Sequence, residues 1–495
     1  MKKLTACLLA LLMLLPLLLS CSESAENRQN EPEPQKTDAA AATPSPDSEA
    51  ESETEPEETL LSDGLPDTNF DGYTFRVASG TGLDSTAGIP SAHFMLMTDD
   101  YSGVPVKDAL RDSTLYIENR FNVNLTYMDY GNGGGAYTAS IKAGDDAFDI
   151  LIAPDWVVYT MGPQGFLLDM KTVEQFDFSK PWWPPIMTDT LTVCGSLYAA
   201  SSYLTYIGLH WTRALMVNKD VASELNVGVP YDTVREGGWT LDALMSYVEG
   251  ASADLNGNGR IDGSDRIGYT TGNGTSYCLQ ESVGISPYAH DEEAGLILNF
   301  DVDRTDTFIS KMRTFMSSAD YLDAGDGFGA GLFRQGKTLL VLGQIGDAYD
   351  IYSGCDFAYG FLPCPKFDEL QESYINCCTD EPWAIPTTVA GEQIGIVGTI
   401  VEAMSCYNYQ HVLPVYFDVS MKRRMADSPD DAEMLQLIAD TRTTSFAYAF
   451  DLTFKNILAD VGDVSGVSSY LAKSQKIAER QIANMVKSIQ KNQKG

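Results

Sequence analysis

The stretch from Gly72 to Pro154 constrains the fold most, because two kinds of apolar pattern alternate along it. Runs suited to strands, "YTFRVASG", "VNLTYMDY" and "FDILIA", are separated by "VKDALRDSTLYIENRF" and "AYTASIKAGD", which suit helices. This order predicts an α/β fold with a parallel sheet and helices on both faces. Ligands of such sheets bind beyond the carboxyl ends of the strands. That rule directs attention to residues 79–82 and to Asp155 and Trp156.

The alternation resumes further along the chain. "RALMVNKDVASEL" predicts a strand followed by a helix, and "WTLDALMSYVEGA" predicts a helix capped by Thr240. "TLLVLGQIGDAY" and "FAYGFLP" suit strands, and the C-terminal part of the chain suits helices, with an apolar face expected from Val467 to Ile489. About 430 folded residues exceed one compact core, so two domains are expected.

The segment that precedes Gly64 differs in kind from the rest of the chain. Residues 1–20 begin with two lysines and continue as an apolar run, which predicts a secretory signal peptide. The run is short for a membrane span, and Pro16 would interrupt a helix there. Residues 22–63 hold 13 acidic and 2 basic residues and almost no apolar ones. Such a segment buries too little apolar surface to fold, so residues 21–63 are expected to be a disordered tether.

The net charge excludes several partners. The chain carries 69 acidic and 33 basic residues, a formal charge of −36, of which −27 remains on residues 64–495 once the tether (−11) and the signal lysines (+2) are removed. A body this acidic repels phosphate backbones and anionic lipid surfaces, so neither nucleic acid nor a flat membrane contact is expected. Nine cysteines at irregular positions do not suggest a disulfide framework, although a bridge such as Cys364 to Cys377 stays open.

The end of the signal peptide, Leu18-Leu19-Ser20-Cys21, resembles the lipobox of bacterial lipoproteins. That resemblance implies that Cys21 becomes the N-terminus and carries a lipid. The alternative is an ordinary cleaved signal followed by a chance cysteine.

The body has a wider resemblance, carried by several short pieces in a fixed order. These are "FDGYTFRVASG", "RFNVNLTY", "FDILIAP", "GFLLDM", "DFSKPWW", "GSLYAASS", "ALMVNKD", "WTLDAL" and "FAYGFLPCPKFDE". Together they resemble an extracellular solute-binding protein of an ABC importer, of the kind that usually serves sugars. The resemblance implies a periplasmic-binding-protein-like fold of two α/β lobes joined by a hinge. It places the first lobe at residues 72–197 plus 357–412 and the second at residues 198–356 plus 413–490.

The segment "DLNGNGRIDGSD", residues 254–265, has the ligand spacing of a calcium loop. The expected oxygen ligands are Asp254, Asn256, Asn258, the carbonyl of Arg260, Asp262 and Asp265, with Gly259 at the sharp turn. Aspartate in place of glutamate at the last position predicts weak affinity. No amphipathic helix follows, so a structural Ca²⁺ staple is expected rather than a sensor. The alternative is a solvated turn that binds nothing.

Two nucleotide-like motifs are judged coincidental. "GLFRQGKT", residues 331–338, matches the phosphate-loop pattern but leads into a predicted strand instead of a helix. "GNGGGA", residues 131–136, matches the dinucleotide pattern, yet a lone match in an exported chain is weak.

Aromatic and polar residues near the predicted strand ends are the candidate ligand contacts. Sugars stack their C–H faces on flat rings and bond their hydroxyls to carboxylates and amides. The candidates are Asp155, Trp156, Trp182, Trp183, Trp211, Gln344, Asp347 and Trp383. For each of them the alternative is packing in the core or anchoring a loop.

These features predict a lipid-anchored, extracytoplasmic receptor, expected to be a monomer, that passes a sugar or oligosaccharide to ABC permease subunits. No nucleophile motif or triad spacing points to an enzyme. Two other readings stay open: a secreted carbohydrate-active enzyme and a surface adhesion lipoprotein, each with the loop as a structural calcium site.

Overall fold

The computed structural model describes residues 60–80, 96–131, 133–271, 276–325, 328–352, 354–378, 382–422, 428–461 and 466–494. Leu60–Gly495 forms a compact unit separate from Met1–Thr59. The predicted signal peptide, Cys21 and the tether up to residue 59 therefore lie outside the described residues. Within the described part of the chain, no helix has both the length and the apolarity needed to cross a bilayer.

The first sheet has four strands in the order β12-β3-β1-β2. They are β1 (Tyr73–Ser79), β2 (Val123–Asp129), β3 (Ile150–Ile152) and β12 (Trp383–Ala384). β1 is parallel to both β2 and β3, which confirms the parallel sheet predicted from the alternating pattern. β12 joins antiparallel, with Trp383 opposite Ile152. Its first residue therefore lies at the edge where β3 ends.

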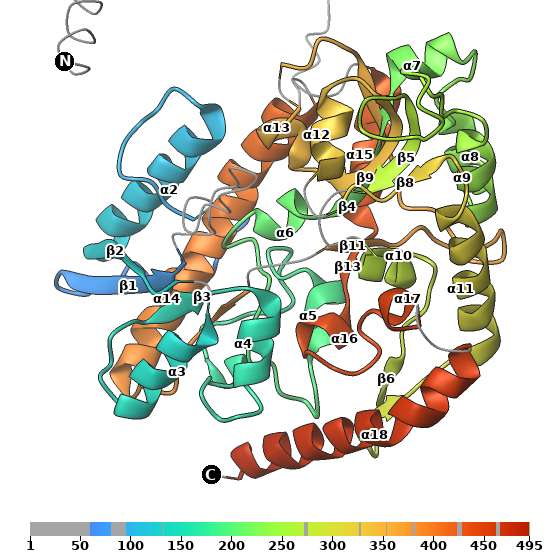
Figure 1. Cartoon of the computed structure of the whole chain (residues 1–495). Coiled ribbons are helices and arrows are strands. Elements are labelled where there is room, and N and C mark those ends of the chain that lie inside the picture. The colour runs from blue at the N-terminus through green and yellow to red at the C-terminus, as the bar shows by residue number, and fades with distance from the viewer. Residues whose placement is uncertain are drawn as a thin grey trace, which may run out of the picture. The chain divides into compact units, whose positions relative to one another are not determined.

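Helices α2 (Pro105–Phe121), α3 (Gly134–Ala143), α4 (Asp155–Met161) and α14 (Glu392–Tyr407) surround this sheet (Figure 1). In α2 the predicted apolar stripe is confirmed, because the residues at its helical spacing are all buried: Val106, Leu110, Ser113, Ile117 and Phe121. Burying this stripe anchors the helix, since an apolar face of this width is what drives helix packing.

The second sheet has five strands in the order β10-β4-β9-β5-β8. They are β4 (Arg213–Asn218), β5 (Ile267–Thr271), β8 (Tyr321–Leu322), β9 (Thr338–Gln344) and β10 (Tyr359–Leu362). β5 and β9 are parallel, and β4 is antiparallel to β9 with Arg213 opposite Gln344. The start of β4 therefore shares an edge with the carboxyl ends of β5 and β9.

One expected lobe boundary needs correction. The lobe assignment placed residues 357–412 with the first lobe, but β10 pairs with β4 in the second sheet. The run "FAYGFLP" is apolar enough to be buried in either sheet, so its pairing partner could not be read from composition.

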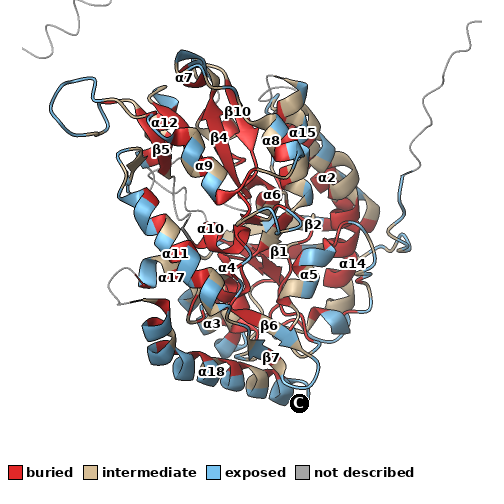
Figure 2. Ribbon diagram, turned by 90° about the vertical axis from the view of Figure 1, so that its right-hand side faces the viewer, coloured by how far each residue is buried: buried red, intermediate tan, exposed pale blue. Residues whose placement is uncertain are grey.

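Around the second sheet lie α7 (Lys219–Glu224), α8 (Tyr231–Arg235), α9 (Leu241–Val248), α11 (Val302–Met316) and α12 (Phe328–Arg334) (Figures 1 and 2). The predicted cap of α9 is confirmed, because the side-chain oxygen of Thr240 accepts a hydrogen bond from the Ala243 amide at 3.3 Å. In Figure 2 the strands of this sheet are buried, while the helices show an exposed outer side.

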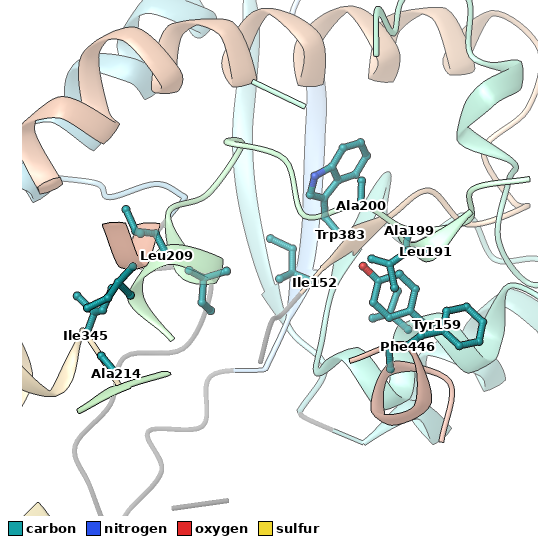
Figure 3. Close-up of a cluster of buried hydrophobic side chains, with 14 of the residues drawn as sticks. Ile152, Tyr159, Leu191, Ala199, Ala200, Leu209, Ala214, Ile345, Trp383 and Phe446 are labelled. Atoms are coloured by element: carbon teal, nitrogen blue, oxygen red, sulfur yellow. The ribbon is translucent and has the colours of Figure 1, made fainter. Parts of the chain in front are cut away.

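The chain passes between the two sheets through short pairings. Ala200 bridges to Trp383 and Thr212 to Cys378, and β11 (Asn376–Cys378) runs parallel to β13 (Arg442–Thr444). Figure 3 shows the apolar cluster at this junction. Leu209, Ala214 and Ile345 lie on one side, and Ile152, Trp383, Ala200 and Phe446 on the other. The core therefore runs without a break from one sheet to the other.

The C-terminal helix α18 (Val467–Asn492) packs one face on the body and leaves the other exposed (Figure 2). Most of the apolar face expected from Val467 to Ile489 is buried, but Ile477, an apolar residue within that range, is 56% exposed, so the expectation fails at this position. Ala478, the next residue, is buried instead. The side chain of Asn492 donates hydrogen bonds to the carbonyls of Gly162 and Pro163, which follow α4.

The predicted tether extends too far toward the body, because residues 60–63 contact it. The Leu61 amide bonds the side chain of Gln410, and the Arg120 guanidinium pairs with Asp63 and, at 2.7 Å, with Asp67. Arg120, at the end of α2, thus binds Asp63 and Asp67. Composition alone placed Asp63 in the disordered tether.

Candidate functional site

The ligand edge of the first sheet presents Asp155 and Trp156, as predicted. Both follow β3 directly, in the first turn of α4. Asp155 is buried, and its Oδ1 accepts the Trp156 amide at 2.8 Å. The Trp156 side chain is 45% exposed, an unusual exposure for a ring that already contacts the body. Its free face is available to a ligand.

The corresponding edge of the second sheet presents Arg213, Gln344 and Asp347. Gln344 ends β9, and Asp347 begins α13 (Asp347–Asp350). The Gln344 amide donates to Asp347 Oδ2 at 2.9 Å, which fixes the carboxyl group. Burial raises the pKa of Asp347 to about 6, although that bond and the Arg213 charge oppose the shift. The predicted residues Gln344 and Asp347 therefore do lie at a strand edge.

Three aromatic rings connect the two edges. Tyr277 from α10 (Ser276–Ser282), which follows β5, stacks on Tyr448 from α16 (Phe446–Ala449) with ring centroids 4.0 Å apart and planes 6° apart. Tyr448 in turn meets Trp156 edge to face at 5.8 Å. Burial raises the pKa values of both tyrosines, and the Asp155 carboxylate adds to each shift. The edge carrying Asp155 therefore faces the edge carrying Tyr277.

Several buried hydrogen-bond donors at this site have no partner among the described residues. They are Nε and Nη1 of Arg213, Nε1 of Trp211 and the hydroxyl of Tyr277. Buried polar groups in folded proteins are nearly always hydrogen-bonded, and the exceptions cluster at functional positions. The predicted residue Trp211, two residues before Arg213 in the chain, thus has a buried indole N–H without a partner among the described residues.

The structure places three of the predicted tryptophans in the core and not at a ligand surface. Trp182, Trp183 and Trp383 are each at most 1% exposed. The indole N–H groups of Trp182 and Trp183 both donate to the Glu402 carboxylate at 2.9 Å, and Trp383 donates to Ser202 at 2.9 Å. The motif "PWWPP" therefore anchors α14 to the loop before α5 (Pro185–Leu191). It does not offer rings to a ligand.

Two thiols lie beside the aromatic stack. Cys278 and Cys377 are fully buried and form a small cluster with Tyr277 and Tyr448. Burial raises the pKa of Cys278, but hydrogen bonding with Cys377 and the Arg213 charge outweigh it and lower the value to about 7. All seven cysteines of the body are free thiols, and the bridge considered between Cys364 and Cys377 is not formed.

The predicted calcium loop is closed by hydrogen bonds from its own backbone amides to its carboxylates. Oxygens of Asp254 accept the amides of Gly257, Asn258 and Gly259, and Asp265 Oδ2 accepts the Asp262 amide. Gly259, at the sharp turn, has φ of 79°, which favours glycine.

The calcium donor set fits Ca²⁺ in chemistry, since carboxylate and amide oxygens are its preferred ligands and each carboxylate keeps lone pairs unused. Asp265 is fully buried, whereas Asp254 is exposed. Within the described residues, no group of three or more His, Cys, Asp or Glu side chains is gathered closely enough to hold a metal ion. Calcium binding at this loop therefore stays a prediction.

The two nucleotide-like motifs lie in contexts that differ from each other. "GLFRQGKT" spans the end of α12 and the start of β9, so it lacks the strand–loop–helix order of a phosphate loop. "GNGGGA" does connect a strand, β2, to a helix, α3. Its Gly134 lies so close to α4 that a Cβ there would be 2.9 Å from Val157 Cγ1. Close packing of two helices accounts for that glycine.

A hollow of about 440 Å³ lies on another part of the body. It is lined by residues 60–67, by Tyr116 and Arg120 of α2, and by residues of α14 and the turn that follows. None of the strand-end residues lines it, so it is not part of the candidate site.

Sequence reasoning missed Arg213, Tyr277 and Tyr448. The strand-end rule could have found Tyr277, because "RIGYTTGNGTSY" places it shortly after a strand. Arg213 was visible as a charged residue opening an apolar strand, "RALMVN". Tyr448 had no local signal, since it reaches the site from a segment much nearer the C-terminus than either strand edge.

Two α/β sheets whose ligand edges face each other across a short hinge define a two-lobed binding protein. Residues 116–388, more than half of the chain, match the family of bacterial extracellular solute-binding proteins. The chain belongs to that family. A search among curated proteins finds no match.

Solved structures share the fold at low sequence identity. An ABC substrate-binding protein from Listeria monocytogenes in complex with cycloalternan is 13% identical, covers 86% of this chain and 99% of its own, and has a TM-score of 0.50. UspC from M. tuberculosis is 14% identical, with 82% and 100% covered and a TM-score of 0.50. A cyclo/maltodextrin-binding protein complexed with maltotetraose is 15% identical, with 87% and 98% covered and a TM-score of 0.50. These similarities show the periplasmic-binding-protein-like fold.

Proposed function

We propose that the protein is a lipid-anchored receptor that binds a sugar or oligosaccharide between its lobes and delivers it to an ABC permease. The observation that carries this proposal is the aromatic series Trp156–Tyr448–Tyr277, which joins the ligand edges of the two sheets. Flat rings beside carboxylates suit the C–H faces and hydroxyls of a sugar. The saccharides named for the Listeria and maltodextrin-binding structures support the same ligand class.

The proposed mechanism requires no covalent step. A ligand stabilises the closed arrangement only by the amount that it binds this state more tightly than the open one. Contacts with Trp156 on one edge and Tyr277 on the other would be complete only when the lobes meet. Because Tyr277 is buried, the lobes must part at the β11–β13 junction to admit a ligand.

The proposed location is the outer face of the cell membrane. Cys21, directly after the apolar run, would carry the lipid and be the only membrane contact, and residues 22–59 would tether the body. The permease subunits are the expected protein partners, and the receptor is expected to act as a monomer without nucleic acid. The loop at residues 254–265 would bind Ca²⁺ as a structural staple, fixing α9 to β5.

The test is a calorimetric and thermal-shift screen of the chain from residue 22 onward, with mono- and oligosaccharides, amino acids and peptides. Binding to the native state raises the melting temperature by mass action. We expect a saccharide to bind without being consumed, and Trp156→Ala to weaken it about 10- to 100-fold, since stacked rings dominate such sites. Tyr101→Ala, which removes an exposed aromatic ring whose hydroxyl bonds Asp112 of α2, is the matched control.

A ligand that is consumed would make the protein an enzyme. Binding of amino acids or peptides but of no saccharide would refute the proposed ligand class. Unchanged affinity in Trp156→Ala would move the site away from the aromatic series.

A further inference from the structure

Arg213 is a buried cation at the ligand edge of the second sheet. It is the first residue of β4, opposite Gln344 at the end of β9, and only 3% of it is exposed. On either side of it, Ala214 lies opposite Gly343, and the Ile345 amide donates to the Thr212 carbonyl at 2.9 Å. The guanidinium interacts electrostatically with Tyr277, Cys278 and Asp347. It therefore points into the site that the aromatic series crosses.

Within the described residues, the guanidinium of Arg213 has no ion pair of the kind that a buried arginine normally has. Nε and Nη1 are buried without a hydrogen-bond partner, and no ion pair joins Arg213 to a carboxylate of the described residues. An arginine side chain stays protonated at any pH a protein survives. An isolated buried charge is strongly unfavourable, so such groups are almost always paired.

None of the acidic groups described around Arg213 forms an ion pair with it. Asp347 acts on Arg213 through space, but its Oδ2 accepts the Gln344 amide, and no ion pair joins it to the guanidinium within the described residues. Burial raises the pKa of Glu281 to about 8, and its carboxyl accepts the Ser445 hydroxyl at 2.6 Å, so it is largely uncharged at neutral pH. The Cys278 thiol also interacts with the guanidinium; burial opposes its ionisation, whereas hydrogen bonding with Cys377 and the Arg213 charge favour it and lower its pKa.

A second unpartnered polar group lies beside Arg213. The Tyr277 hydroxyl is buried without a hydrogen-bond partner among the described residues, and Tyr277 interacts electrostatically with the guanidinium. A ligand with acceptor oxygens can satisfy both groups. An anionic acceptor such as a carboxylate suits a guanidinium better than a neutral hydroxyl, because its hydrogen bonds are charge-assisted.

We propose that the ligand is an acidic saccharide whose anionic group binds Arg213 while its ring stacks on the Trp156–Tyr448–Tyr277 series. The inference rests on the proposed function and adds a substrate class to it. A sugar carboxylate is the expected group, because it supplies the missing counter-charge together with oxygens that accept from the unpartnered guanidinium donors. A sulfate or phosphate ester presents similar oxygens and forms the second arm of the test.

The test compares matched pairs of probes by calorimetry on the chain from residue 22 onward. The pairs are glucuronate with glucose, galacturonate with galactose, and the oligomers of each, and the second arm uses glucose 6-sulfate and glucose 6-phosphate. We expect the acidic member to bind at least about tenfold more tightly, as a charge-assisted pair adds roughly 10- to 100-fold. Arg213→Gln should remove that preference, so that the acidic and the neutral member of each pair bind the variant within about threefold of each other.

Arg480→Gln, an exposed arginine on α18, is the matched control and should change neither affinity. Tighter binding of a sulfate or phosphate ester than of any uronate would assign Arg213 to that ester and refute the carboxylate. Tighter binding of the neutral sugars, or an unchanged preference in Arg213→Gln, would overturn the inference and leave the sugar receptor standing. If no saccharide of either kind binds, the proposed function fails and the inference falls with it.

Discussion

The buried carboxyl group of Glu402 offers the sharpest test of the energetics of this fold. It accepts hydrogen bonds from the indole N–H groups of both Trp182 and Trp183 at 2.9 Å, in the core between α14 and the loop before α5. Burial raises its pKa from 4.5 to about 7, although the two indole bonds oppose the shift. The folded protein therefore holds a proton at Glu402 more tightly than the unfolded chain does.

The stability that comes from this proton is fully present below pH 4.5 and is lost as the pH rises through about 7. The difference between 4.5 and about 7, at 1.36 kcal/mol for each pH unit, corresponds to a loss of about 3 kcal/mol in the free energy of unfolding. Glu402→Gln cannot titrate. The loss of stability between pH 4 and pH 8 should therefore be about 3 kcal/mol smaller in the variant than in the wild type.

The assay is urea unfolding followed by tryptophan fluorescence at pH 4, 6 and 8. Only the difference between the two proteins matters, because Asp347 and Glu281 titrate in the same range in both. Glu369→Gln, an exposed glutamate, is the matched control and should behave as the wild type. Equal pH dependence in Glu402→Gln and the wild type would show that the Glu402 carboxyl is not held neutral by the core.

Three further outcomes follow from the site and the chain ends. Adding millimolar Ca²⁺ to the chelator-treated protein should raise its melting temperature, and Asp254→Asn should reduce that shift; an equal shift in both would place any calcium elsewhere. Arg213→Met should raise the free energy of unfolding of the ligand-free protein by about 1–4 kcal/mol, because an unpaired buried charge is removed; a fall would reveal an ion partner. Cys21→Ser should release the protein from the membrane fraction of cells, and retention there would disprove the lipid anchor.

Much of the fold could be predicted because local patterns carry it. The stripe of α2, the Thr240 cap and the parallel pairing of β1 with β2 and β3 all follow from the spacing of apolar and capping residues. Long-range pairing could not be read in the same way. The placement of β10 depends on its partner β4, from which it is separated in the chain by β5, β8 and β9.

The sequence predicted where the candidate site lies, but it did not predict all of the residues that form it. The strand-end rule led to Asp155, Trp156, Gln344 and Asp347. The choice among tryptophans could not be made, because a ring that donates to a buried carboxylate and a ring that faces solvent look alike in sequence. Glu402, whose carboxylate accepts the Trp182 and Trp183 indole N–H groups and so keeps both rings in the core, lies far from both of them in the chain.

The terminal helix α18 links distant parts of the body. It packs against α11, which contacts β8 of the second sheet, and against β7 (Gly295–Leu298) of the separate β6–β7 pair. Just past its end, Gln493 donates hydrogen bonds to the Cys194 carbonyl and, at 2.9 Å, to the Ser196 hydroxyl, beside the first sheet. A helix that is bound at both ends, to elements on opposite sides of a hinge, limits how far the hinge can open. We expect the fastening at Asn492 and Gln493 to set the widest opening angle, and Gln493→Ala to increase the radius of gyration of the ligand-free protein in solution scattering.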